Sequence, residues 1–194
     1  GMGKSTLLKL VYANYRATSG LIEVCQADGR VLELTQATPR ELVRMRRDTV
    51  GYVSQFLRVI PRVSALDVVA EPLLNLGMTA ELARTRAVDL LARLNIPERL
   101  WSLSPTTFSG GEQQRVNIAR GFAHPYPALL LDEPTASLSA HEASELRRIA
   151  RQLADDGVSV VYISHRLEEV FELADRVSVI RDGKHISTKL IADA

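Results

Sequence analysis

The first six residues of the chain have the composition of a loop that binds phosphate. They match the second half of the pattern G-x-x-x-x-G-K-[ST]. Glycines let backbone N–H groups close around phosphate oxygens, and a helix that follows adds its positive end. The Lys4 ammonium would reach the β- and γ-phosphates, and the Ser5 hydroxyl would ligate Mg²⁺. A glycine-rich helix start with a solvated lysine fits the same string. The loop consists of Gly1, Met2, Gly3, Lys4, Ser5 and Thr6.

Two carboxylates follow an apolar run much later in the chain. Residues 128–131 are all apolar, which is typical of a buried strand in a parallel sheet, and Asp132 and Glu133 come next. Ligand sites in parallel sheets lie at the carboxyl ends of the strands. There Asp132 would hold the Mg²⁺ shell, and Glu133 would orient or deprotonate a water that attacks the γ-phosphate. A strand that ends in a polar turn is the alternative, and the upstream lysine loop makes it the weaker one.

A capping box is expected at residues 109–113, which read SGGEQ. Ser109 would be the N-cap of a helix, and Glu112 would reach back to it from three residues on. A capped helix start with exposed glycine amides is also an anion site, so the two interpretations are compatible.

Two single polar residues follow other expected strands. Gln55 comes after the apolar segment 49–53 and could contact the metal or the attacking water; otherwise it is a surface polar group. His165 comes after the apolar segment 158–163, as Asp132 ends another strand, and could contact the γ-phosphate. A purely structural histidine is the alternative.

The elements that would position these residues alternate between helices and strands. This alternation favours a parallel sheet with helical crossovers, and the helical block 64–124 is interpreted as an inserted lobe. Helices are expected at 4–12, with Leu7 and Leu8 on the buried side, from Pro39, after the caps Ser64, Thr79 and Ser109, and around Leu146–Leu153. Strands are expected at 21–24 and 31–34 as a hairpin, and at 49–53, 128–131, 158–163 and 177–180.

Composition excludes several classes of protein. The 194 residues carry 24 Lys+Arg against 23 Asp+Glu, a net charge of +1, so there is no electrostatic case for nucleic acid as a partner. Cys25 is the only cysteine, which excludes an intrachain disulfide, indicates a reducing compartment, and is expected to be a small buried hydrophobe. Without an apolar run of membrane-spanning length or a signal peptide, a cytoplasmic location is expected. Arg44, Arg46 and Arg47 are expected to form a solvated helix face.

Taken together, the motifs resemble those of ATP-binding-cassette (ABC) ATPases. GMGKST, GYVSQ, SGGEQ, LLLDEP and YISH occur in the order and spacing of that family, and the resemblance covers essentially the whole chain. It implies an α/β P-loop NTPase fold, a mostly parallel sheet flanked by helices with an inserted helical lobe. The RecA-like core would comprise residues 1–55 and 125–194, and the signature lobe residues 56–124.

The same resemblance implies a role for each motif, with ATP and Mg²⁺ as cofactors. Gln55 would be the Q-loop residue at the metal, Asp132 the Walker B aspartate, Glu133 the catalytic glutamate and His165 the switch histidine. The family sandwiches ATP between two cassettes, so a second copy or a homologous subunit is the implied partner. The signature that would face the partner's phosphate loop consists of Ser109, Gly110, Gly111, Glu112 and Gln113.

Different stretches of the chain resemble two different ABC subfamilies. Residues 51–74, 95–103 and 108–122 resemble the ABC protein of the carbon–phosphorus lyase system for phosphonate use, which favours ATP hydrolysis in support of that lyase. Residues 137–184 look more like the ATPase of a sugar importer, whose partner would be a membrane permease docked around residues 56–68. The importer alternative adds a peripheral position at the inner face of the membrane to the expected location.

Two departures from the family pattern bear on activity. By resemblance, the family's first strands, with an aromatic residue that stacks on adenine, would precede Gly1. A third alternative is therefore a chain that binds nucleotide weakly or not at all and does not turn it over. Ser139 stands where many members have the D-loop aspartate, which bears on signalling across the dimer.

Overall fold

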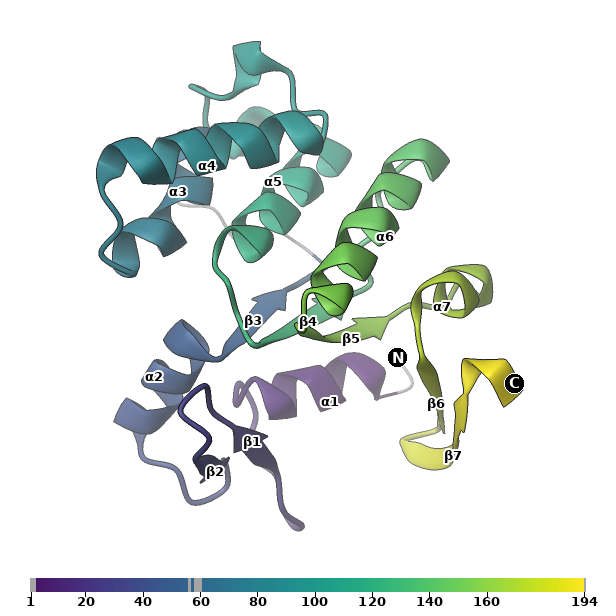
Figure 1. Ribbon diagram of the computed structural model, residues 1–194. Coiled ribbons are helices and arrows are strands. Elements are labelled where there is room, and N and C mark those ends of the chain that lie inside the picture. Colours follow the sequence, from purple (N-terminus) through teal and green to yellow (C-terminus); the bar gives the residue numbers. More distant parts are fainter. Residues whose placement is uncertain (1–2, 56, 58–60, 194) are drawn as a thin grey trace. The chain divides into compact units, whose positions relative to one another are not determined.

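The computed structural model describes residues 3–55, 57 and 61–193 (Figure 1). The chain divides into two compact units. The first comprises the chain up to Tyr52, Tyr126–Asp132 and the chain from Leu153 onward, and the second comprises Val53–Pro125 and Glu133–Gln152. The second unit thus includes residues 133–152, which were predicted to belong to the RecA-like core.

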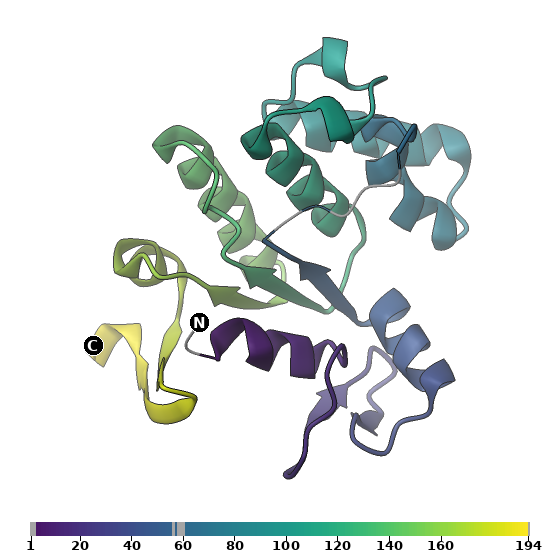
Figure 2. The same cartoon turned by 180° about the vertical axis from the view of Figure 1, so that it is seen from behind.

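A three-stranded sheet in the order β3-β4-β5 lies at the centre of the first unit. Its strands are β3 (Val50–Val53), β4 (Ala128–Asp132) and β5 (Ser159–Ile163). β4 and β5 pair in parallel, with Asp132 opposite Ile163. The arrows of all three strands point the same way in Figures 1 and 2. The predicted parallel sheet is therefore confirmed, and its central strand ends at Asp132.

Helix α1 (Lys4–Val11) lies along one face of this sheet, and its N-terminal end is on the side to which the arrowheads of β4 and β5 point (Figures 1 and 2). Leu8 is buried in a core that also contains Leu130 of β4 and Ile163 of β5. Leu7, which was expected on the buried side, is 44% exposed. Adjacent residues on a helix point about 100° apart, so the core-facing stripe includes Leu8 and leaves Leu7 outside.

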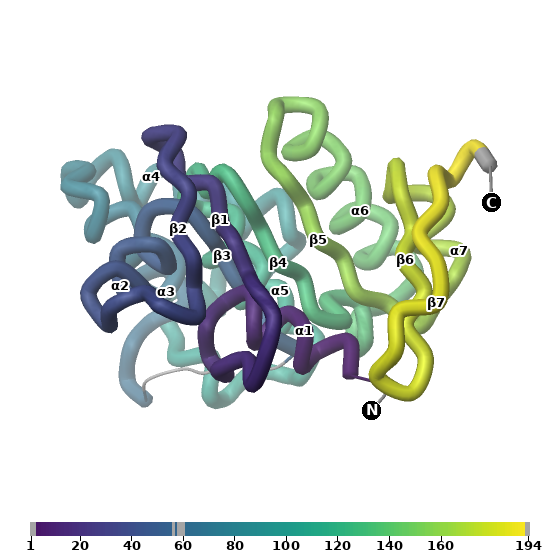
Figure 3. Tube along the Cα trace, turned by 90° about the horizontal axis from the view of Figure 1, so that it is seen from below, coloured from purple at the N-terminus to yellow at the C-terminus, as the bar shows by residue number. Residues whose placement is uncertain are grey.

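A small antiparallel hairpin and helix α2 complete this part of the first unit (Figure 3). The hairpin pairs β1 (Glu23–Cys25) with β2 (Val31–Glu33), as predicted. Cys25 is exposed, so the expectation of a buried thiol is wrong. The alternation of side chains along a strand explains this, because Val24 takes the inward position and its neighbours point out.

Helix α2 (Pro39–Asp48) begins with a capping box between Thr38 and Glu41, with proline at its first turn. Arg46 donates from Nε to the Tyr12 carbonyl at 2.9 Å and from Nη2 to the Ala13 carbonyl at 2.6 Å. The expected solvated arginine face is therefore wrong for Arg46, which binds the Tyr12 and Ala13 carbonyls that follow the C-terminal end of α1.

The chain from Leu167 onward forms α7 (Leu167–Leu173), β6 (Arg176–Arg181), β7 (Lys184–Leu190) and the short helix η3 (Ile191–Asp193). β6 is the expected strand 177–180, but it pairs antiparallel with β7 in a sheet of its own. The turn between them contains Asp182 and Gly183, both with positive φ, as tight hairpin turns require. β7 was missed because KHISTKL is a mostly polar string.

The second unit is helical. α3 (Ala65–Asn75), α4 (Ala80–Arg93) and α5 (Gly110–Ala123) pack against one another and bury apolar side chains such as Val69, Leu91 and Ile118. The side chains of the predicted caps Ser64, Thr79 and Ser109 each accept a backbone N–H of the first turn. Short helices η1 (Glu98–Leu100) and η2 (Pro105–Thr107) precede α5, and most of α6 (Ala140–Asp155) also belongs to this unit. Among the described residues, no helix is both long and apolar enough to cross a membrane.

Candidate nucleotide site

The start of α1 has the features of an anion site. Gly3 is the N-cap residue and has a φ of 83°, a left-handed conformation that glycine adopts without strain. No acidic residue lies in the first turn of the helix, so its positive end is not neutralised by its own side chains. Within the described part of the chain, the Lys4 ammonium makes no hydrogen bond or ion pair. Gly1 and Met2 lie outside the described residues.

Ser5 and Asp132 meet in the first unit, although 127 residues separate them. The Ser5 hydroxyl donates to Asp132 Oδ1 at 2.8 Å, and the Tyr52 hydroxyl donates to Asp132 Oδ2 at 3.0 Å. Asp132 is only 4% exposed, and these two hydroxyl donors compensate the burial of its charge. The predicted meeting of the lysine loop and the carboxyl end of β4 is thereby observed.

The atoms at this place fit Mg²⁺. They are a hydroxyl oxygen and a carboxylate, both hard oxygen donors. No group of three or more His, Cys, Asp or Glu able to hold a metal occurs in the described ranges. At a nucleotide site, one or two protein ligands bind Mg²⁺, and the substrate phosphates and water complete its shell.

Glu133 follows Asp132 in an uncommon backbone conformation. Its φ of 49° lies in the left-handed region, where non-glycine residues are strained. Its carbonyl accepts the Ala136 N–H at 3.2 Å, so the chain turns directly after β4. Strained backbone conformations are common at functional sites. The prediction that Glu133 is the catalytic glutamate is consistent with this.

His165 lies two residues beyond the end of β5 and is exposed. Because Ile163 pairs with Asp132, β4 and β5 end at the same level of one sheet edge. The residues on both sides of His165 are held by Glu169, which is 4% exposed. Glu169 accepts the Ser164 hydroxyl at 3.0 Å and the Arg166 guanidinium at 3.3 Å.

The signature segment belongs to the second unit and has the predicted capping box. Glu112 Oε2 accepts the Ser109 N–H at 2.9 Å and the Ser109 hydroxyl at 2.8 Å. These hydrogen bonds from Ser109, chiefly the one from its side chain, hold the pKa of Glu112 below its ordinary value. Ser109 and Gly110 are exposed, and a Cβ on Gly110 would meet nothing within 4 Å. Gln55, in the same unit, is exposed in a bend after β3.

A family model described as ABC transporter matches residues 1–136. The chain belongs to the ABC transporter family. It is 36% identical over 207 residues to the ribose import ATP-binding protein RbsA of Geobacillus kaustophilus, covering all of this chain and 38% of the relative. It is 34% identical over 184 residues to the macrolide export ATP-binding/permease protein MacB of Salmonella choleraesuis, covering 95% of this chain and 27% of the relative. The chain thus spans less than half of either relative.

Solved structures of an ABC cassette have the same fold. The dimeric ATP-binding cassette MJ0796, in a post-hydrolysis state bound to ADP and Pi, superposes with a TM-score of 0.88 at 29% identity. The match covers 98% of this chain and 81% of that one. The predicted ABC fold, an α/β P-loop NTPase with a parallel sheet flanked by helices, is confirmed.

Two buried polar side chains of α5, the helix that begins with the predicted signature, were missed by sequence reasoning. Gln114 Nε2 donates to the Ser54 carbonyl at 3.4 Å and to the Pro134 carbonyl at 3.3 Å, and Asn117 Nδ2 donates to the Ser54 carbonyl at 2.7 Å. These bonds connect the signature helix to the residue before Gln55 and to the residue after Glu133, all within the second unit. The sequence did contain a sign of them, because Gln114 and Asn117 carry side-chain amides three residues apart, on one face of the helix.

Ser139, which by resemblance stands at the D-loop position, takes part in a local network of hydrogen bonds. Its hydroxyl accepts the Glu142 N–H at 3.4 Å, and its own N–H donates to Glu142 Oε2 at 2.8 Å. Arg115 of the signature helix forms an ion pair with the same carboxylate. The serine thus supports the start of α6 by a cap-like arrangement.

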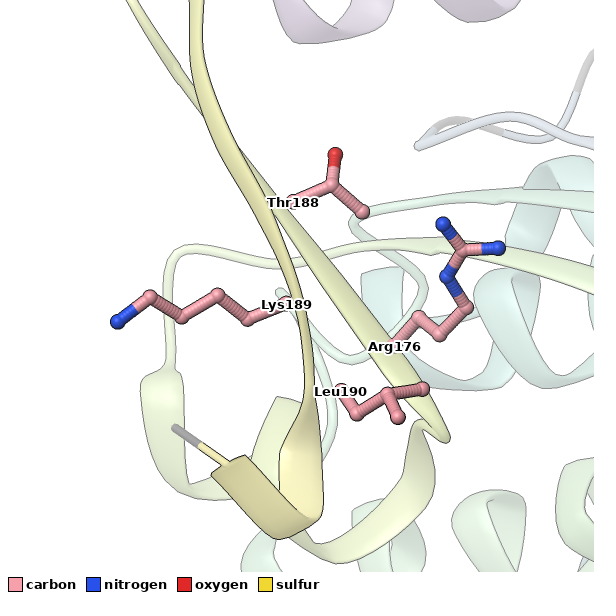
Figure 4. Close-up of a pocket in the computed structure, with 4 residues that line it drawn as sticks. All are labelled: Arg176, Thr188, Lys189 and Leu190. Atoms are coloured by element: carbon pink, nitrogen blue, oxygen red, sulfur yellow. The ribbon is translucent and has the colours of Figure 1, made fainter.

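A hollow of about 560 Å³ on the β6–β7 hairpin is lined by Arg176, Thr188, Lys189 and Leu190. Figure 4 shows the Arg176 and Lys189 side chains pointing to opposite sides of the hairpin. Because the two cations do not converge, the hollow lacks the arrangement that would bind an anion.

Proposed function

We propose that the protein binds Mg·ATP at the Ser5–Asp132 end of the first unit and hydrolyses it as the ATP-binding subunit of an ABC importer. The hydrogen bond from Ser5 to Asp132 carries the proposal, because it brings the predicted phosphate loop and Walker B strand together. The family match and the fold shared with an ADP-bound cassette support it.

In this proposal each residue of the site has one task. The free Lys4 ammonium offsets the charge of the β- and γ-phosphates, and the amide end of α1 adds its dipole. Ser5 and Asp132 would hold Mg²⁺, which supplies charge neutralisation at the phosphates. Glu133 accepts a proton from the attacking water, and His165 contacts the γ-phosphate. Gln55 would contact the metal or that water.

The signature segment is proposed to bind the nucleotide of a second cassette, either another copy or a homologous subunit. Its exposed, capped helix start leaves the amide of Gly110 open on the surface of the second unit. MJ0796, which shares the fold, is a dimer in its solved structures.

The importer assignment is better supported than the lyase assignment. The relatives named above are transport proteins, and the match to RbsA extends over the whole chain. Phosphonate metabolism rests only on the resemblance of residues 51–74, 95–103 and 108–122. In the importer, a permease would dock on residues 56–68, of which 56 and 58–60 lie outside the described residues, and the subunit would sit peripherally at the membrane. Co-purification with a permease would support this proposal, and co-purification with lyase subunits would replace it by the second candidate.

Phosphate release from ATP tests the activity. We expect Glu133→Gln to lower the turnover number by about 100-fold or more, because positioned proton transfer contributes about 10²–10⁴-fold. The matched control is Glu168→Gln, the same change on an exposed residue of α7, which should leave turnover intact.

Unchanged turnover in Glu133→Gln would show that another residue acts as the base. Absence of both turnover and nucleotide binding in the wild-type protein would instead favour the alternative of a chain that binds nucleotide weakly or not at all. Calorimetric titration with ATP separates these two results.

A further inference from the structure

Tyr52 contacts the carboxylate that the proposed function places at Mg²⁺. Its hydroxyl donates to Asp132 Oδ2 at 3.0 Å, while Ser5 donates to Oδ1 at 2.8 Å. The two carboxylate oxygens therefore receive hydroxyl donors from different elements, β3 and α1. Tyr52 belongs to the motif GYVSQ, in which Gln55 alone has a predicted role. The phenol of Tyr52 therefore has no predicted function.

Packing holds the Tyr52 ring in place. The ring lies against Tyr12 with the centroids 5.1 Å apart and the planes tilted by 33°. Arg46 lies over the Tyr12 ring, with its guanidinium carbon 5.2 Å from the ring centroid, and it also donates to the Tyr12 carbonyl. Both tyrosines pack against the core that contains Leu8 and Leu130. The phenol is therefore aimed at Asp132 by its surroundings before any ligand binds.

A carboxylate held at one oxygen only can rotate about its side-chain bonds. A second hydrogen bond at the other oxygen fixes the plane of the group and its direction toward the metal. Partners that orient a ligand in this way strongly influence metal affinity. A rigid, half-buried phenol does so at a small cost in entropy, because its ring is already ordered by packing.

We propose that Tyr52 is a positioning residue for the proposed Mg·ATP site, orienting the Asp132 carboxylate so that its Oδ1 edge faces the Ser5 hydroxyl and the metal. The inference rests on the proposed function. It assigns to Tyr52 a part in metal-dependent nucleotide binding and none in contacting the nucleotide itself.

The test compares Tyr52→Phe with the wild-type protein by calorimetric titration of a non-hydrolysable ATP analogue, once with excess Mg²⁺ and once with EDTA. Phenylalanine keeps the ring and its packing on Tyr12 and removes only the hydroxyl. We expect the dissociation constant with Mg²⁺ to rise about tenfold, the lower end of the usual effect of removing such a partner. The constant in EDTA should stay within about twofold of the wild-type value. The control is Tyr15→Phe, which removes the hydroxyl of a tyrosine that is 53% exposed, and it should change neither constant.

The outcomes separate the inference from the proposed function. Equal losses with and without metal would show a purely structural role and overturn the inference, as would no loss in either titration. In both cases the wild-type protein still binds Mg·nucleotide, so the proposed function stands. A wild-type protein whose nucleotide binding is unaffected by Mg²⁺ would overturn both. Thermal unfolding of Tyr52→Phe checks that the fold is retained.

Discussion

The Ser5–Asp132 end of the first unit and the signature segment of the second unit are built in opposite ways. In the first, hydroxyl groups of Ser5 and Tyr52 meet Asp132 across 127 and 80 residues of chain. In the second, Ser109 and Glu112 pair over three residues, and the helix start they form remains exposed. The first region therefore depends on the tertiary fold. The second is made by local sequence, and its first residues, Ser109 and Gly110, are exposed on the surface of its own unit.

The largest effect on nucleotide binding is expected from Lys4→Ala. Loss of a charge-assisted contact to phosphate costs about 1.5–3 kcal/mol, which corresponds to about a 10–150-fold rise in the dissociation constant of Mg·ATP. Calorimetric titration measures it. The matched control is Lys9→Ala at the other end of the same helix, where the ammonium lies over the Tyr15 ring, and it should bind as the wild-type does. Equal weakening in both variants would remove Lys4 from the site.

A smaller effect is expected when the signature is blocked. Gly110→Arg places a long side chain where a Cβ meets nothing, so the second unit should fold and the approach of a second cassette should be hindered. We expect turnover to fall by about tenfold or more, equivalent to about 1.4 kcal/mol in the barrier, with ATP affinity of the single chain little changed. The exposed connector variant Ser102→Arg serves as the control.

If Gly110→Arg weakened nucleotide binding as strongly as Lys4→Ala did, the contrast between the two regions would be wrong. The signature would then act on the nucleotide bound by its own chain.

The free energy of unfolding should respond differently to a methyl group added in β3, next to Tyr52, and to one added at the signature segment. On Gly51 of β3 a Cβ would lie 2.4 Å from the Tyr126 ring and 2.8 Å from Leu129, so Gly51→Ala should lower the free energy of unfolding by about 1–3 kcal/mol. Gly110→Ala should be neutral or stabilising by up to about 1 kcal/mol, because the space is open and alanine favours the helix. Urea unfolding of both variants checks the difference; a neutral Gly51→Ala would show that the sheet there adjusts easily.

The smallest effect is expected from the pH dependence of the local region. The pKa of Glu112 is lowered by its bonds from Ser109, so the capping box stabilises the fold above the ordinary carboxyl pKa. That contribution is lost as the pH falls through the lowered pKa of the folded state. The wild-type protein should therefore be more stable than Glu112→Gln at about pH 7, and the difference should shrink toward about pH 3. The control is Glu41→Gln in the Thr38 capping box, where hydrogen bonds also lower the glutamate pKa, and it should behave alike. A difference that grew on acidification would contradict the assignment.

The same contrast explains which features could be predicted from the sequence. The helix start at Pro39 and the caps Ser64, Thr79 and Ser109 depend on residues within one turn, and the structure has all four helix starts. The meeting of the lysine loop with Asp132 followed from a general rule about strand ends in parallel sheets.

Features that depend on distant partners were missed or misjudged. The hydroxyl of Tyr52 reaches a residue 80 positions away, and Gln114 reaches a carbonyl 60 positions away. Arg46 looked solvated on its own helix, but its partners are the carbonyls that follow α1. No local pattern encodes such pairs, because they are set by how strands and helices pack.

The most direct test of the proposed site is a crystal structure of the protein with Mn²⁺, in place of Mg²⁺, and a non-hydrolysable ATP analogue. We expect an anomalous peak next to Ser5 Oγ, with Asp132 in or beside the metal shell and the phosphates at the start of α1. A metal and nucleotide bound away from Ser5 and Asp132, with their hydrogen bond unchanged, would contradict it.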